Sequence, residues 1–220
     1  MHYPNVIVDS DAPPVSEPTA PQVGHYKPEN FSDRFALGAT KLLRLLADLC
    51  FRQHYIHRAV VLETVAAVPG MVGATLQQLQ ALRLLRGRPD MVKLLIDESE
   101  NERMHLMTFV SMCQPNLLER ALILMSQGLF FNGFFLLYLL SPYTAHRLVG
   151  YFEEEAVVSY TRFLAAIDDG QIADRPIPAF ARAYWKLDGN AGLRDLVIAV
   201  RQDEMHHRDV NHHLSLALQD

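Results

Sequence analysis

Residues 101–107 read NERMHLM, and residues 203–208 read DEMHHR. Each stretch contains a glutamate followed three residues later by a histidine, namely Glu102 and His105 in the first and Glu204 and His207 in the second. Positions i and i+3 lie on the same face of an α-helix, so each motif places a carboxylate beside an imidazole. One such pair is common by chance, but two in one chain predict two halves of a shared metal site.

Two other segments each offer one glutamate on an apolar face. Glu63 is the only acidic residue in a helical pattern that runs from about residue 55 to 86. Farther along, Glu153, Glu154 and Glu155 are consecutive, and a rotation of about 100° per residue points them in three directions. Only Glu153 shares its face with apolar residues throughout, whereas Glu154 and Glu155 share theirs with polar ones. We therefore expect Glu63 and Glu153 to point inward.

The four segments together match a known arrangement of metal ligands. Ferritin-like dinuclear proteins take one glutamate from each of two helices and a Glu-x-x-His pair from each of two others. Carboxylate and imidazole ligands suit iron or manganese. A purely structural bundle would leave four carboxylates buried and unpaired, which is costly. The predicted metal ligands are Glu63, Glu102, His105, Glu153, Glu204 and His207.

Helical periodicity extends over almost all of the chain after residue 30, and proline and glycine separate the helices. No alternation typical of a β-strand is sustained. We predict an all-α fold, a ferritin-like four-helix bundle with two additional helices, and a loop over 168–180. The predicted helices are 32–53, 55–86, 89–113, a fourth that begins in QPNLLER and ends near 140, 142–168 and 191–218.

Charge and hydrophobicity indicate a membrane rather than nucleic acid as the partner. The net charge is −5, which argues against nucleic-acid binding. Residues 121–140 carry no charge and are long enough to span a bilayer, but polar residues and glycines interrupt them. With the amphipathic helix at 32–53, they predict two helices that lie in a membrane interface. An ordinary core or dimer surface is the alternative.

The N-terminal region differs from the rest of the chain. Residues 1–30 hold six of the twelve prolines and only one Lys or Arg, Lys27, so they do not resemble a targeting sequence. We divide the chain into an extended arm over 1–30 and a metal-binding bundle over 31–220. Cys50 and Cys113 are the only cysteines, so no disulfide framework is expected.

Several stretches closely resemble the signature boxes of the alternative oxidases. They are LETVAAVPGM, NERMHLMTF, YFEEEAVVSYTRFL and DEMHHRDVNH, with RPIPAFARAYWKL before the last helix. The resemblance covers roughly residues 30–218 and implies a cyanide-insensitive ubiquinol oxidase that reduces O₂ to water without pumping protons. It implies two non-haem iron ions per chain. It also implies a homodimeric, monotopic protein on the matrix side of the mitochondrial inner membrane.

The resemblance implies roles for further residues. Tyr160 corresponds to an essential tyrosine beside the metal centre. A quinol pocket falls on Arg58, Leu62, Glu155, Ala156 and Ser159. Residues that orient the ligands fall on Asn101, Asp203, His206, Tyr184 and Trp185. Judged from the residues alone, Tyr160 could equally be a core tyrosine, and Arg58 an interfacial arginine at a helix start.

Two alternatives of other functional classes are compatible with the ligands. An iron-binding, ferritin-like protein would explain the metal site but not the apolar segment at 121–140. A di-iron hydroxylase or desaturase would differ in its product. Many plant alternative oxidases carry a regulatory cysteine near the N-terminus, whereas residues 1–49 contain none here. We therefore expect a protist or fungal type without disulfide regulation.

Overall fold

The computed structural model describes residues 25–51, 55–85 and 89–218. Within these ranges the regular structure is helical, apart from one isolated antiparallel bridge between Pro176 and Gly192. The all-α prediction is therefore confirmed. The helices are α1 (Phe31–Phe51), α2 (Tyr55–Leu84), α3 (Pro89–Cys113), α4 (Leu117–Leu140), α5 (Pro142–Asp168), α6 (Ala179–Tyr184) and α7 (Leu193–Leu216).

The six predicted helices are present with small differences at their ends. Asn116 caps α4 with a capping box to Glu119, and Ser141 caps α5 through the backbone N–H of Thr144. The short helix α6 was missed, and its first two residues fall in the predicted loop. Six residues are too few to display a helical period, so sequence pattern could not reveal it.

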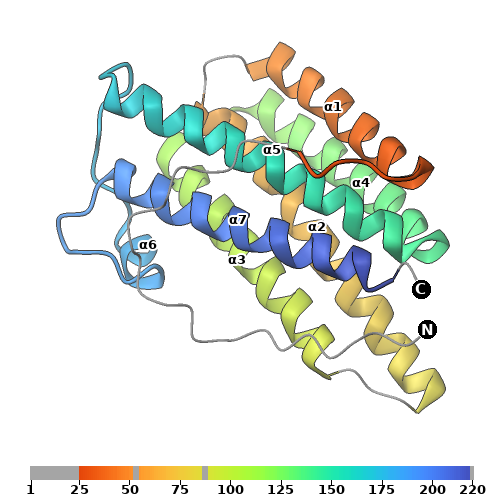
Figure 1. Cartoon of the computed structure of the whole chain (residues 1–220). Coiled ribbons are helices and arrows are strands. Elements are labelled where there is room, and N and C mark those ends of the chain that lie inside the picture. Colours follow the sequence, from red (N-terminus) through yellow and green to blue (C-terminus); the bar gives the residue numbers. More distant parts are fainter. Residues whose placement is uncertain (1–24, 52–54, 86–88, 219–220) are drawn as a thin grey trace.

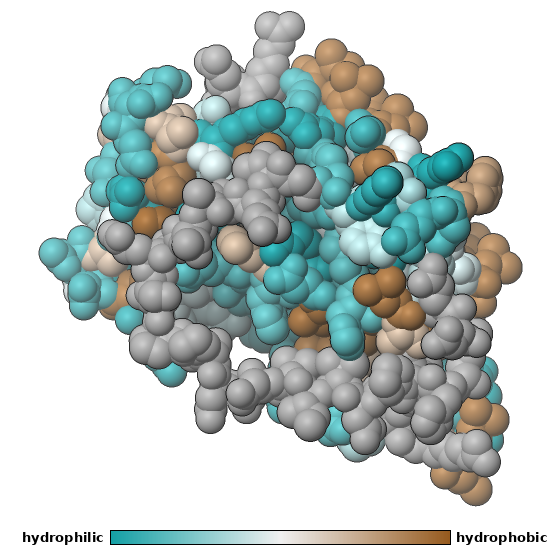
Figure 2. Space-filling model, viewed as in Figure 1, coloured by the Kyte–Doolittle hydropathy of each residue, from teal (hydrophilic) through white to brown (hydrophobic). Residues whose placement is uncertain are grey.

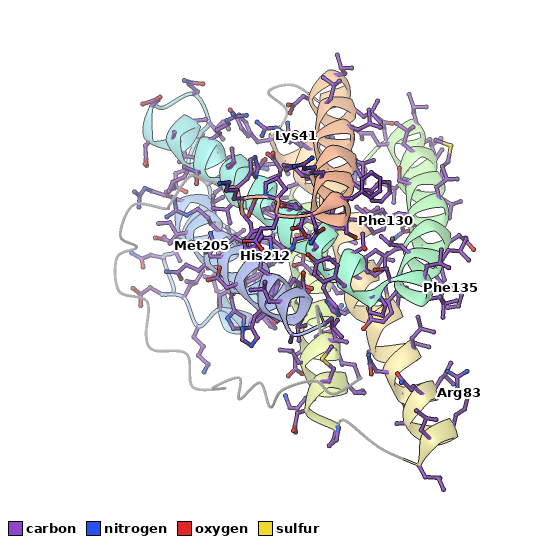
Figure 3. The ribbon with its side chains drawn as sticks, turned by 45° about the vertical axis from the view of Figure 1, so that its right-hand side comes forward. Lys41, Arg83, Phe130, Phe135, Met205 and His212 are labelled. Atoms are coloured by element: carbon purple, nitrogen blue, oxygen red, sulfur yellow. The ribbon has the colours of Figure 1, made fainter. Side chains whose placement is uncertain are left out.

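Four helices form the bundle, and two others cover one side of it. Helix α2 packs mainly on α3, and α5 packs mainly on α7, while α1 lies against α5 and α4 lies against α2 and α5 (Figure 1). In the turned view, α1 and α4 stand on one side of the bundle, and α7, which carries Met205 and His212, lies on the other (Figure 3). One side of the bundle therefore carries an additional layer, formed by α1 and α4.

Helices α2 and α3 approach each other closely at a glycine. A Cβ atom at Gly70 would lie 2.4 Å from the backbone oxygen of Leu95 and 2.9 Å from Cβ of Ser99. Only a residue without a side chain permits this distance. The contact lies two turns from Glu63 and so contributes to the spacing of the two helices at the metal ligands.

Helix α4 exposes most of its apolar surface. Both α2 and α4 are long and apolar enough to cross a membrane, but 61% of the apolar window of α2 is buried, against 11% for α4. Only Phe134 and Tyr138 of α4 are fully buried. Helix α1 also exposes a row of leucines, and Figure 2 shows hydrophobic surface along the upper right edge, where α1 lies in Figure 1. These two helices form an apolar outer layer.

Candidate metal centre

The six predicted ligands converge inside the bundle. Helix α2 supplies Glu63, α3 supplies Glu102 and His105, α5 supplies Glu153, and α7 supplies Glu204 and His207. None of the six is more than 5% exposed. Each lies on the inward face of its helix, as the sequence pattern predicts.

The ligands form two overlapping groups. The first contains Glu63, Glu102, His105 and Glu204, and the second contains Glu102, Glu153, Glu204 and His207. Within each group, one ligand atom from every residue lies within 4.8 Å of the others. Glu102 and Glu204 belong to both groups, so their carboxylates lie where they could bridge two neighbouring cations. The cluster is compatible with a metal site.

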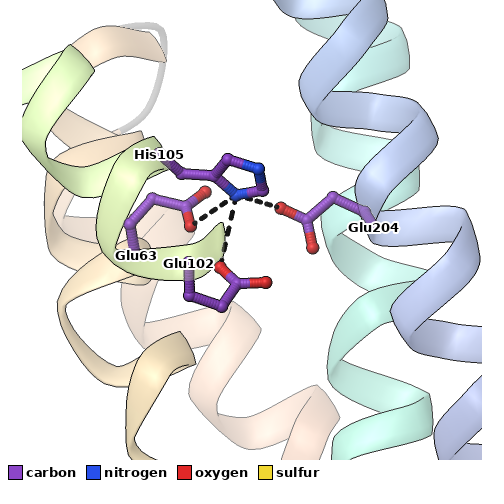
Figure 4. Close-up of side chains that lie close together, drawn as sticks. All are labelled: Glu63, Glu102, His105 and Glu204. Atoms are coloured by element: carbon purple, nitrogen blue, oxygen red, sulfur yellow. Dashed lines mark ion pairs between the residues drawn. The ribbon is translucent and has the colours of Figure 1, made fainter. Parts of the chain in front are cut away.

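The first group shows how closely the ligand atoms gather. Nδ1 of His105 lies 3.4 Å from Oε2 of Glu63, 3.3 Å from Oε2 of Glu102 and 3.3 Å from Oε1 of Glu204 (Figure 4). In the second group, Nδ1 of His207 lies 2.6 Å from Oε1 of Glu102. Carboxylates from three helices thus surround one imidazole nitrogen.

These atoms lack hydrogen-bond partners even though they are buried. Oε2 of Glu63, both oxygens of Glu102, Nδ1 of His105, Oε2 of Glu204 and Nδ1 of His207 make no aligned hydrogen bond. Buried polar atoms without partners are costly, and clustered carboxylates repel one another. Two divalent cations would satisfy the lone pairs and neutralise the charge. The donor set therefore fits a pair of metal ions of the iron or manganese type.

The ionisation of the carboxylates reflects this crowding. Burial and the charge of Glu102 raise the pKa of Glu63 to about 8, and the same two causes raise that of Glu204 to about 8. Burial and the charge of Glu204 raise the pKa of Glu153 well above its usual value. Glu102 differs, because His105 and His207 outweigh burial and hold its pKa well below the usual value. Metal binding to these groups would release protons.

The outer nitrogen of His105 is held by Asp203. Nε2 of His105 lies 3.1 Å from Oδ2 of Asp203, and the same oxygen accepts hydrogen bonds from Trp185 Nε1 at 2.7 Å and Asn101 Nδ2 at 3.0 Å. Asn101 Nδ2 also donates to the hydroxyl of Tyr184 at 3.2 Å. A proton on Nε2 leaves the lone pair of Nδ1 directed at the carboxylates, as a metal ligand requires.

The structure thus brings together four of the five residues predicted to orient the ligands. The fifth, His206, is exposed, and its ring centre lies 6.3 Å from that of His207. It directly precedes His207 in α7, and a rotation of about 100° per residue turns it off the ligand face toward solvent.

Two further residues near His207 were not singled out from sequence. Glu98 is buried, and its Oε1 accepts a hydrogen bond from Asn211 Nδ2 at 2.9 Å, while its Oε2 has no partner. Asn211 also donates to the backbone oxygen of His207 at 3.0 Å and contacts His146 Nδ1 at 2.9 Å. Both lie four residues from a ligand on the ligand face of the helix, and this spacing was the signal that could have identified them.

Tyr160 lies directly against a ligand. Its hydroxyl donates a hydrogen bond to Oε1 of Glu63, and its ring stacks on Phe109 with centres 5.9 Å apart. Burial and the charge of Glu63 raise the pKa of Tyr160 well above its usual value, so the phenol keeps its proton. The structure therefore places a redox-capable side chain one hydrogen bond from the metal ligands.

The predicted quinol-pocket residues lie at the surface of the bundle beneath α1. Arg58 of α2 is buried and donates to Asp48 of α1, while Glu155 of α5 accepts from Arg44 of α1. The remaining three are partly buried on α2 and α5, namely Leu62, Ala156 and Ser159. Helix α1 thus holds both charged members of the set.

Glu154 is buried although it shares its helical face with polar residues in the sequence. It is 6% exposed and contacts His25, Tyr26 and His212. The pattern of α5 alone could not reveal this burial, because the covering residues come from the segment before α1 and from α7, both distant in the sequence.

Comparison with known proteins agrees with this geometry. The sequence profile of the alternative oxidase family matches residues 16–216. This chain belongs to the alternative oxidase family. The family assigned by resemblance is thereby confirmed, and the match extends over both Glu-x-x-His motifs.

Individual alternative oxidases are similar over most of the chain. A ubiquinol oxidase, mitochondrial, of Batrachochytrium dendrobatidis is 54% identical over 191 residues, which is 87% of this chain and 60% of the relative. A ubiquinol oxidase, mitochondrial, of Mangifera indica is 53% identical with the same coverage. Alternative oxidase 3, mitochondrial, of Glycine max is 51% identical over 87% of this chain and 59% of the relative. The chain spans about 60% of the length of these relatives.

Proposed function

We propose that this chain is a ubiquinol oxidase that reduces O₂ to water at a dinuclear iron centre. The observation that carries the proposal is the pair of ligand groups sharing Glu102 and Glu204, in a chain that belongs to the alternative oxidase family. Relatives that are 54% and 53% identical are named ubiquinol oxidases. The net reaction is two ubiquinols and one O₂ giving two ubiquinones and two waters.

Two iron ions per chain would be held by the six ligands. One would lie among Glu63, Glu102, His105 and Glu204, and the other among Glu102, Glu153, Glu204 and His207. When bound, iron supplies one-electron redox chemistry and positions at which O₂ can bind. The Asp203 carboxylate would keep a proton on Nε2 of His105, so that a metal ion would displace the proton on Nδ1 and bind there.

The residues around the ligands exclude water and carry a proton. Phe109 and Val200 are completely buried beside the cluster and limit solvent access. The hydroxyl of Tyr160 keeps its proton and donates it in a hydrogen bond to Oε1 of Glu63, inside the site, where the proton can be passed on together with an electron. Each ubiquinol supplies two electrons and two protons, so two quinols balance the four-electron reduction of O₂.

The quinol would bind beside α5 on the side that faces α1. Arg58 provides a hydrogen-bond donor and Glu155 an acceptor for a hydroxyl group of the quinol. Leu62 and Ala156 provide apolar surface for its ring. Ser159 directly precedes Tyr160 in α5. Leu62 likewise directly precedes Glu63 in α2, so the proposed pocket adjoins the candidate metal centre on both helices.

Membrane attachment follows from the apolar layer formed by α1 and α4. Since only 11% of the apolar window of α4 is buried, this helix presents a large hydrophobic face. We propose that both helices lie in one leaflet, which makes the protein monotopic and gives lipid-dissolved quinol direct access. The proposed setting is the matrix face of the mitochondrial inner membrane, with the protein as a homodimer. The word mitochondrial in the names of its relatives supports this setting.

Oxygen uptake by the purified protein tests the proposal. With its iron quantified, in detergent and with cyanide present, the protein should consume O₂ with a short-chain ubiquinol at about two quinols per O₂. Glu153→Ala should abolish uptake and lower bound iron. Iron binding without quinol-dependent uptake would favour the ferritin-like alternative, and a hydroxylated product would favour the hydroxylase.

A further inference from the structure

We propose that His25, in the extended segment before α1, is a positioning residue of the quinol site. This inference rests on the proposed function, because it assigns His25 a role in orienting Glu155. We call residues 25–30 the N-terminal strap, since they run along α5 without helical structure and lead into α1 (Figure 1). The strap belongs to the segment that the sequence pattern assigned to a separate arm.

The strap is seated on a buried carboxylate of α5. Glu154 Oε2 lies 2.5 Å from Nδ1 of His25, and Glu154 Oε1 accepts the backbone N–H of Tyr26 at 2.7 Å. Nε2 of His212 in α7 lies 2.8 Å from the same Oε1. The hydroxyl of Tyr151 donates to the backbone oxygen of Tyr26 at 3.1 Å. Contacts from backbone and side chains thus place His25 in a defined position.

The seat itself is rigid. Arg147 is completely buried and donates to Nδ1 of His212 at 2.8 Å, which leaves the His212 proton on Nε2, where it donates to Glu154. The Arg147 guanidinium also lies 3.8 Å above the centre of the Tyr26 ring. A Cβ at Gly150 would lie 2.5 Å from Nδ1 of His212, so the glycine makes room for this ring.

From this seat, His25 reaches the proposed quinol pocket. Its Nε2 lies 3.2 Å from Oε1 of Glu155, and Arg44 of α1 donates to the other oxygen, Oε2. The Glu155 side chain is 10% exposed, and its Oε1 is buried without an aligned hydrogen bond. Helix α1 therefore holds one oxygen of this carboxylate, and the strap places an imidazole at ion-pair distance from the other. Without His25, the Glu155 carboxylate is held through Oε2 alone.

The same line of charges continues to the other polar residue of the pocket. Nε of Arg44 lies 3.6 Å from Oδ2 of Asp48, and Oδ1 of Asp48 accepts a hydrogen bond from Arg58. Charges of alternating sign thus run from the strap along α1 to α2. In this arrangement Arg44 and Asp48 orient Arg58, while His25 limits the rotation of the Glu155 carboxylate.

His25→Ala tests the proposal in the full chain loaded with iron. We expect KM for a short-chain ubiquinol, and Kd for ubiquinone-1, to rise about two- to five-fold, the range of a partly exposed ion pair. Because His25 does not contact the metal ligands, kcat and iron content should stay within error of the unaltered protein. His25→Gln, which retains one donor, should recover part of the loss and serves as the test variant if His25→Ala does not fold.

Two control variants separate positioning from loosening of the strap. Tyr151→Phe removes a strap contact without touching Glu155, and Lys27→Ala alters an exposed strap residue. Neither should change KM. If Tyr151→Phe raises KM as much as His25→Ala does, then the strap acts only through folding and the proposal is overturned.

A double-mutant cycle with Glu155→Gln supplies the decisive readout. If His25 acts through Glu155, His25→Ala should add nothing to the Kd of ubiquinone-1 in the Glu155→Gln background. Additive effects, or no effect of His25→Ala on a protein that oxidises quinol, would overturn the inference alone. If His25→Ala raises the Kd of ubiquinone-1 but the unaltered protein does not oxidise quinol, the proposed function alone would be overturned. Absence of ubiquinone-1 binding would overturn both.

Discussion

At the residue scale, the metal centre depends on which nitrogen or oxygen of each side chain faces the cluster. His105 presents Nδ1 to three carboxylates because Asp203 occupies its Nε2. Tyr160 donates to Glu63, and Glu98 holds Asn211 beside His207. The ligands are therefore oriented by hydrogen bonds that reach one layer farther out.

Asp203→Asn should weaken metal binding by about 10- to 100-fold, the usual effect of losing such an orienting partner. An amide in place of the carboxylate can present its NH₂ to Nε2, which favours the tautomer that has no lone pair on Nδ1. Competition with a chromophoric chelator measures the affinity. Asp209→Asn, the same change at an exposed position of α7, is the matched control and should leave the affinity unchanged. Equal affinity of both variants would contradict the role of Asp203.

Tyr160→Phe should retain iron and lose quinol oxidation by about 10²-fold, the range for removal of a positioned proton donor. The phenyl ring keeps the stacking on Phe109, so a folding defect is not expected. Metal analysis, thermal unfolding and oxygen uptake measured on one preparation test this directly. Full turnover with normal iron would show that Tyr160 is an ordinary core tyrosine.

At the scale of secondary-structure elements, the spacing of helices decides whether the ligands meet. Glu63 stands on α2 and Glu102 on α3, and these helices touch at Gly70. Helix α5 contributes to three environments through consecutive glutamates, since Glu153 faces the metal site, Glu154 faces the strap and Glu155 faces α1. One helix thus couples the metal centre to its surroundings.

Gly70→Ala should lower the free energy of unfolding by about 1–3 kcal/mol, because the added methyl group collides with the backbone of α3. Denaturant titration monitored by circular dichroism gives this value. Gly128→Ala in α4 is the control, since a Cβ there meets nothing within 4 Å. Because alanine has a higher helix propensity than glycine, Gly128→Ala should leave the free energy of unfolding unchanged or raise it by up to about 1 kcal/mol. Equal destabilisation of both variants would exclude close helix packing as the cause.

The apolar layer of α4 should be required for membrane attachment. Leu124→Glu combined with Leu129→Glu introduces two charges into side chains that are 72% and 71% exposed. We expect binding to phospholipid vesicles to fall at least ten-fold in a flotation assay, because each charge opposes insertion into the apolar phase. Oxygen uptake in detergent should persist. Leu85→Glu, at the end of α2 and outside the layer, should bind vesicles normally.

At the scale of the whole molecule, the bundle encloses more negative charge than its own cations balance. Four carboxylates share the site with two histidines, and the pKa values of Glu63 and Glu204 rise to about 8. Burial opposes the charged form of His207, but Glu102 outweighs it and raises the pKa to about 9. In the metal-free protein, bound protons stabilise the site in the place of cations.

This charge balance predicts a pH-dependent stability that metal removes. Glu63, Glu204 and His207 all bind protons more tightly in the folded than in the unfolded chain. The stabilisation from these protons is therefore full below the unfolded pKa values, which are 4.5 for glutamate and 6.5 for histidine. It is lost as the pH rises through the folded values of about 8 and about 9.

Chelator-treated protein should accordingly show a free energy of unfolding that falls between pH 5 and about pH 9, measured by urea titration at several pH values. Protein reloaded with Fe²⁺ under anaerobic conditions should lose this slope, because cations replace the protons. A flat profile without metal would mean that the carboxylates are already balanced by other groups.

Local spacing along the sequence was sufficient to predict the six candidate ligands and the helices that carry them. The helical period relates residues three and four apart, so Glu102 with His105, and Glu204 with His207, had to share a face wherever the helices packed. Apolar neighbours then marked Glu63 and Glu153 as inward. These are properties of single helices, and the structure reproduces them.

Contacts between distant segments were decided by the tertiary structure alone. Three features depend on how helices pack around one another: which carboxylates belong to both candidate ligand groups, the burial of Glu154 beneath the strap, and the pairing of Asn211 with Glu98. The sequence by itself determined which side chains face inward, because the helical period is local. Only the packed bundle determined which of them touch, because contacts between residues far apart in the chain follow from helix spacing and close packing.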